Sequence, residues 1–159
     1  MKRTTTAKTL AVAAITVLAL GIAPLASADN KGCTNETLKG TFVHTASGFE
    51  TAPPAIAGPL VGVGTDTFDG KGGMTTTATL SINGNIVPVS IAGTYTVNPD
   101  CTGTATIGVY DQSGNLLRTG VLAGVYVNNG KEVRDIFESL TLADGTSLPV
   151  VITAEATKQ

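Results

Sequence analysis

Turn-forming residues recur at short, regular intervals along most of this chain, and they restrict what it can fold into. Each turn segment contains Gly or Asn, which readily take the positive φ angle that a tight hairpin requires. The stretches between these segments are rich in Thr, Val and Ile, which favour strands over helices. The chain is therefore predicted to be almost entirely β. The turn segments span residues 69–73, 83–84, 98–103, 111–115, 128–131 and 144–145.

The stretches between the turns predict eight strands. Short loops between successive strands require antiparallel neighbours, because a parallel crossover needs a much longer connection. A single helical turn is expected before the first strand, over residues 34–39, where Thr34 is a candidate N-cap. The predicted strands cover residues 40–47, 59–68, 73–82, 85–97, 102–110, 115–127, 131–142 and 147–156.

Apolar and polar residues alternate in the central strands. In the strand over residues 85–97, Val89 and Tyr95 share one face, while Ser90 and Thr94 share the other. One face of the sheet should therefore be buried and the other exposed to solvent. An up-and-down barrel removes the edges of such a sheet, whereas a two-sheet β-sandwich, the alternative, leaves edges to be protected. The predicted fold class is all-β, an eight-stranded antiparallel up-and-down barrel.

The N-terminal residues predict a secretory signal peptide over residues 1–28. Three basic residues precede an apolar stretch that ends in the small triplet Ala26-Ser27-Ala28, which is the order of parts found in cleaved signals. Residues 29–159 would then form a single domain, since their number suits one core. We expect the protein to be exported to the periplasm or the extracellular space.

Cys33 and Cys101 are the only cysteines of the chain. In an exported protein such a pair predicts a structural disulfide. Zinc would need about four ligands, and a single histidine, His44, cannot complete a Cys/His set with two cysteines. The cysteines are also not in the C-x-x-C arrangement of redox proteins. No metal and no cofactor are therefore expected.

The charge of the chain bears on its partners. Removal of the signal leaves seven of the ten Lys and Arg residues and all twelve Asp and Glu residues, a net charge of −5. Such a surface is poorly suited to nucleic acid or to an anionic membrane. A membrane-spanning barrel would carry aromatic girdles, whereas this chain has four Phe, three Tyr and no Trp. We expect neither nucleic-acid binding nor stable membrane insertion, and the oligomeric state is not predicted.

Three segments of the chain are similar to one group of proteins. They are CTNETLKGTF at residues 33–42, GTDTFDGKG at 64–72 and GTYTVNPDCTG at 93–103. Together they resemble exported bacterial proteins with an allene oxide cyclase-like barrel. The resemblance implies a small lipocalin-like, eight-stranded barrel joined by a bridge between Cys33 and Cys101. It implies little about activity, and no catalytic residue is assigned because the catalytic residues of the plant cyclases do not match positions of this sequence.

Glu138 is a candidate ligand-binding residue. It shares a face of its predicted strand with Ile136 and Leu140, so if that face points inward the carboxylate enters an apolar lumen. Desolvation would then raise its pKa, as a ligand anchor or general acid requires. The alternative is that the face with Asp135 and Phe137 points inward, which leaves Glu138 in water.

Tyr95 is the second candidate ligand-binding residue, because it carries a polar tip on the apolar face of its strand. It would orient a ligand or simply fill the core. His44 is interpreted as a lone strand histidine bonded to backbone or water rather than as a catalytic base. Asp66 is grouped with the scattered aspartates that favour turn conformations.

Three classes of function follow from a small barrel. A binding protein would hold a small apolar molecule in the lumen, where a cavity above about 300 Å³ would be expected. A structural or surface-interaction protein would have a filled barrel and use its outer face. A cyclase- or isomerase-like enzyme would fold a reactive substrate in the lumen, with Glu138 or Tyr95 assisting. Whether the lumen is hollow distinguishes the second class from the others.

Overall fold

Eight long strands succeed one another in the computed structural model, which describes residues 32–51, 54 and 57–159 of the chain. The predicted signal peptide, residues 1–28, lies outside the described residues. A 3-10 turn, η1 (Asn35–Leu38), precedes the strands. The strands are β1 (Gly40–Glu50), β2 (Gly58–Phe68), β3 (Gly73–Ile82), β4 (Asn85–Val97), β5 (Thr102–Tyr110), β6 (Leu116–Val127), β7 (Glu132–Leu142), the two-residue β8 (Ser147–Leu148) and β9 (Val150–Lys158).

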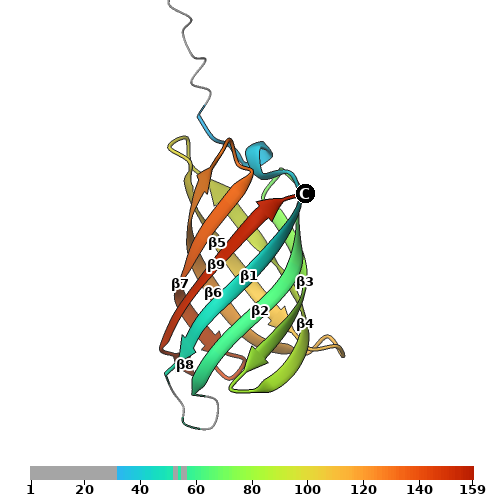
Figure 1. Cartoon of the computed structure of the whole chain (residues 1–159), viewed down its shortest axis with the longest axis vertical. Coiled ribbons are helices and arrows are strands. Elements are labelled where there is room, and N and C mark those ends of the chain that lie inside the picture. The colour runs from blue at the N-terminus through green and yellow to red at the C-terminus, as the bar shows by residue number, and fades with distance from the viewer. Residues whose placement is uncertain (1–31, 52–53, 55–56) are drawn as a thin grey trace, which may run out of the picture. The chain divides into compact units, whose positions relative to one another are not determined.

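The strands form one closed antiparallel sheet. Each strand from β1 to β7 pairs with the next, β7 also pairs with β9, and β9 returns to β1. The ring therefore closes without a free edge among the long strands, and the strands wind obliquely around a common axis (Figure 1). This arrangement confirms the predicted eight-stranded up-and-down barrel over the two-sheet sandwich.

The two ends of the barrel differ. Figure 1 shows η1 at one end, here called the η1 end, and β8 at the opposite end, here called the β8 end. Leu38 of η1 is 1% exposed, so this turn covers the η1 end with an apolar side chain. A disulfide joins Cys33, just before η1, to Cys101, just before β5, which confirms the predicted bridge. No helix in the described part of the chain is long and apolar enough to cross a bilayer.

The predicted alternation sets the two faces of the barrel. In β4, Val89, Tyr95 and Val97 are buried, while Ser90 and Thr94 are exposed. The inward residues of β3 alternate with exposed threonines in the same way. The buried side chains form two adjoining apolar clusters, one toward the η1 end around Phe42 and one toward the middle and the β8 end around Ile152.

The first and the last predicted strands differ most from the observed ones. β1 continues to Glu50, three residues past its predicted end, because residues 48–50 still pair with β2 and β9. The last predicted strand is interrupted at Pro149, which separates β8 from β9. Proline has no backbone N–H to contribute to the ladder, so it breaks a strand at that point.

The Asn83–Gly84 turn between β3 and β4 has the predicted hairpin geometry. Ile82 pairs with Asn85, and the two central residues have φ angles of 48° and 85°. We expect Gly84→Val to lower the free energy of unfolding by about 1–2 kcal/mol, because a β-branched residue is strained at positive φ. No atom outside the turn lies within 4 Å of a Cβ at this position, so the loss would reflect backbone strain alone.

Urea denaturation measures this effect. Thr79→Val, at an exposed position of β3, is the matched control and should change stability by less than about 0.5 kcal/mol. A Gly84→Val variant as stable as the control would show that the turn does not require positive φ.

Candidate functional site

Within the described part of the chain, the inner face of the barrel lines an interior cavity and a mouth cavity. The interior cavity has a volume of about 110 Å³ and is lined by side chains from every long strand, mostly apolar. The mouth cavity, at the β8 end, has a volume of about 360 Å³. Only the mouth cavity exceeds the roughly 300 Å³ expected of a pocket for a drug-sized ligand. The barrel is therefore hollow in part, and the two spaces must be considered separately.

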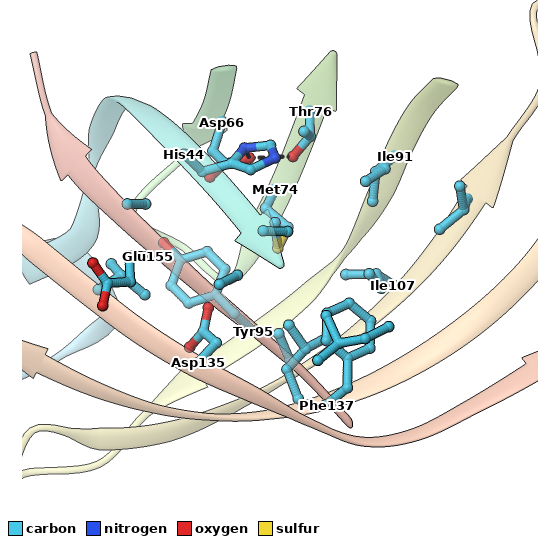
Figure 2. A pocket seen from close by; sticks show the side chains of 18 of the residues that line it. His44, Asp66, Met74, Thr76, Ile91, Tyr95, Ile107, Asp135, Phe137 and Glu155 are labelled. Atoms are coloured by element: carbon cyan, nitrogen blue, oxygen red, sulfur yellow. Dashed lines mark hydrogen bonds and ion pairs between the residues drawn. The ribbon is translucent and has the colours of Figure 1, made fainter. Parts of the chain in front are cut away.

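A buried polar cluster faces the interior cavity. His44 of β1 lies with its Nδ1 atom 2.9 Å from Oδ1 of Asp66 on β2, and both side chains are 10% exposed. Thr76 of β3 donates its hydroxyl to the same Oδ1 at 2.6 Å. Nδ1 of His44 forms no hydrogen bond in this geometry, so the imidazole and the carboxylate of Asp66 are in close contact only. Figure 2 shows the three side chains side by side at one edge of the cavity.

The sheet register explains how these residues meet. Asp66 and Thr76 are direct cross-strand partners, whereas His44 pairs with Gly64, two residues before Asp66. A Cβ on Gly64 would lie 2.5 Å from His44 Cε1 and 2.6 Å from the carbonyl oxygen of Thr77. Glycine at this position therefore lets the imidazole lie across β2 and reach the carboxylate.

Asp135 of β7 enters the same cavity (Figure 2). Its neighbours across β6 and β9 are small, Gly124 and Ala154, which leaves room for the carboxylate. Burial raises the pKa of Asp135 to about 7; the charge of Asp66 adds to the rise, and that of His44 opposes it. A substantial fraction of Asp135 is therefore protonated at neutral pH, and in that form it is a hydrogen-bond donor.

Aromatic side chains separate the cluster from the η1 end. The rings of Phe42, Phe68 and Tyr95 meet edge to face, with centroids 5.2 and 5.1 Å apart. Tyr95 lies on the inner face, as expected, and lines the interior cavity. Its hydroxyl donates to the carbonyl of Asn35 and accepts from the N–H of Gly70. Because these bonds hold η1 in place, a ligand would meet the ring of Tyr95 rather than a free hydroxyl.

Glu138 lies on the outer face and is exposed, so the expectation that it points into the lumen is wrong. Ser139 pairs with Val121 while Phe137 pairs with Leu122, which leaves Glu138 as the extra residue of a β-bulge. A bulge changes the phase of alternation. Inward positions therefore run through Asp135 and Phe137, as in the alternative weighed from the sequence. After the bulge they resume at Leu140, which was expected on the same face as Glu138.

A buried ion pair lies toward the β8 end. Arg118 of β6 donates to Oε1 of Glu50, at the end of β1. The side chain of Glu50 is fully buried and that of Arg118 is 11% exposed. Arg118 lines both cavities, so it stands between the interior space and the mouth.

The sequence interpretation missed both the contact between His44 and Asp66 and the pair of Glu50 and Arg118. His44 has a carboxylate neighbour rather than only backbone or water, and Asp66 lies within β2 rather than at a turn. Asp66 is in phase with the buried Leu60 and Phe68, and this alternation was the signal that could have placed it inside. Among residues 32–51, 54 and 57–159, no group of three or more His, Cys, Asp or Glu side chains is arranged to hold a metal ion.

Comparison with known proteins supports the fold. The structure of EF1p2_mFAP2b bound to DFHBI matches with a TM-score of 0.57 and 13% identity, over 82% of this chain and 98% of that chain. The redesigned β-barrel mFAP1 bound to DFHBI matches with a TM-score of 0.51 and 16% identity, over 78% of this chain and 97% of that chain. No known protein-family profile matches the sequence, and no curated protein matches it. At these identities the likeness shows a shared barrel fold.

Proposed function

We propose that the interior cavity binds a small, mainly apolar molecule that carries one polar group. The observation that carries the proposal is the placement of His44, Asp66 and Asp135 against a cavity whose other walls are largely apolar. Buried ionisable groups with shifted pKa values are costly to stability, and they concentrate at functional sites. In a barrel whose interior serves only as a packed core, these groups would not increase stability.

The size of the cavity limits the ligand. An apolar cavity of about 150 Å³ holds a benzene molecule, so a volume of about 110 Å³ suits a single small ring or a short chain. The polar group of the ligand would meet Asp135 and the pair of His44 and Asp66. A hydroxyl fits both, because it donates to a carboxylate and accepts from a protonated carboxyl group. The fold neighbours bound to DFHBI are further support, at the level of the barrel alone, for a ligand inside.

A cyclase- or isomerase-like enzyme, the alternative function, would use the same side chains. His44 would serve as a base and protonated Asp135 as an acid across the cavity, since proton transfer needs groups of this kind beside the substrate. Binding must precede such a step. An experiment that detects binding therefore tests the first requirement of both functions.

Export through a signal peptide over residues 1–28 is part of the proposal. The disulfide between Cys33 and Cys101 supports it, because such bonds persist in oxidising compartments. Membership of the allene oxide cyclase-like group of exported bacterial barrels is proposed on the sequence segments named above, and the barrel fold agrees with it.

Phenol is a suitable probe of the interior cavity. We expect it to bind and to shift NMR signals of inward-facing methyl groups, those of Ala105 and Ile107 among them. Ala105→Leu would extend into the cavity and should weaken phenol binding by at least about tenfold, the equivalent of roughly 1.4 kcal/mol. Ala92→Leu is the matched control, because Ala92 lies on the neighbouring strand and faces outward.

Toluene extends the test to the polar cluster. It has nearly the shape of phenol but cannot form the hydrogen bonds, so we expect it to bind more weakly. Phenol that shifts no inward methyl signal, or that binds Ala105→Leu as tightly as the parent protein, would contradict the proposal. Thermal unfolding of both variants checks that the barrel is intact.

A further inference from the structure

The mouth cavity is a separate space with its own chemistry. It opens at the β8 end and is bounded by inner faces of β3 to β7. It shares Leu80, Val109 and Arg118 with the interior cavity, which makes these residues the partition between the two spaces. Its lining is apolar apart from Asn83 and Asn85 near the β3–β4 turn and Arg118. An apolar chain would therefore be in contact with apolar walls along most of its length.

Arg118 has N–H donors that could bind a ligand in the mouth cavity. A guanidinium carries five N–H donors, and among the described residues only its Nη1 atom has a side-chain partner, Glu50. The side chain is 11% exposed and lines both cavities, so it lies in largely apolar surroundings. A hydrogen bond formed in such a place is stronger than one formed in water. An oxygen acceptor placed against Arg118 would use these donors.

Glu50 determines which kind of acceptor fits. Its carboxylate is fully buried and neutralises the guanidinium. A ligand carboxylate would bring a second negative charge close to Glu50 in a poorly solvated space, which is unfavourable. A neutral carbonyl oxygen gains the hydrogen bond without this repulsion.

We propose that the mouth cavity is a binding site for a neutral molecule with an apolar chain and one carbonyl oxygen, such as an ester. The carbonyl accepts from Arg118, and the chain lies against the apolar wall toward the mouth. Glu50 acts as the specificity-determining residue, because it excludes carboxylates. This site is independent of the one proposed for phenol.

Methyl octanoate and octanoate, at neutral pH, are matched probes of the proposal. We expect the parent protein to bind methyl octanoate at least about tenfold more tightly than octanoate, with NMR shifts at the methyl groups of Leu117 and Leu142. Glu50→Gln leaves Arg118 with a net charge, so this preference should fall by at least about tenfold or invert. Tighter binding of octanoate than of the ester by the parent protein would overturn the proposal.

A double variant keeps the test decisive if Glu50→Gln does not fold. Replacing both Glu50 and Arg118 by Met removes the two charges together, a change that buried ion pairs often tolerate. The double variant should lose most of the affinity for methyl octanoate, and unchanged affinity would also overturn the proposal. Ala105→Leu should weaken phenol binding by at least about tenfold and leave ester binding unchanged, so failure at one site is distinguishable from failure at the other.

Discussion

Replacing Asp135 by Asn is expected to raise the free energy of unfolding by about 4 kcal/mol at pH 8 and to change it little at pH 4. The reason is the burial of the carboxyl group in the interior cavity, which raises its pKa from 3.8 to about 7. An Asn side chain has nearly the same shape and never ionises, so it removes the cost of a buried charge.

The direction follows from proton binding in the two states. As pH rises above about 4, Asp135 loses its proton in the unfolded chain but keeps it in the folded protein until about pH 7. The folded state binds more protons over this interval, so the parent protein loses stability as pH rises and reaches a plateau above pH 7. Asp135→Asn should lack this decline.

Urea denaturation at several pH values measures the effect. Glu138→Gln is the matched control, because Glu138 is exposed on the same strand, and its difference from the parent should be small at every pH. A difference between Asp135→Asn and the parent that does not change from pH 4 to pH 8 would show that Asp135 is ionised normally in the folded state.

Reduction of the disulfide is expected to lower the free energy of unfolding by about 4 kcal/mol. Cys33 and Cys101 are 68 residues apart, so their bond closes a long loop and restricts the unfolded chain. The bond also holds η1 over its end of the barrel, where Leu38 is buried. Hydrogen exchange at the amides of η1 should therefore become faster on reduction.

Urea denaturation with and without reductant measures the loss. A variant with both Cys33 and Cys101 replaced by Ser should match the reduced parent protein, and reductant should not change it further. A loss below about 1 kcal/mol would contradict the loop-closure account.

The sequence was sufficient to predict the barrel. Turn residues such as Asn83–Gly84 identify hairpins, because few residues other than Asn and Gly take positive φ without strain. The alternation in β3 and β4 then indicates which face is buried, because side chains of a strand point to opposite sides in turn. Both signals depend on a few neighbouring residues, which a single sequence contains.

The polar interior was harder to predict, because it depends on register and on a bulge. Glu138 and Leu140 would share a face in a regular strand, yet one extra residue in β7 places them on opposite faces. No Gly or Pro marks this bulge in the sequence. Likewise, Glu50 and Arg118 come together across 68 positions of sequence, a contact that only the closed barrel creates.

A crystal structure of the protein soaked with phenol tests the central claim most directly, namely that the interior of the barrel is a binding site. We predict electron density for one phenol ring in contact with Ala105 and Ile107 on the wall of the interior cavity. Its hydroxyl should lie within hydrogen-bond distance of Asp135 or Asp66. A lumen filled by inward side chains, with phenol absent or bound only on the outer face, would contradict the account.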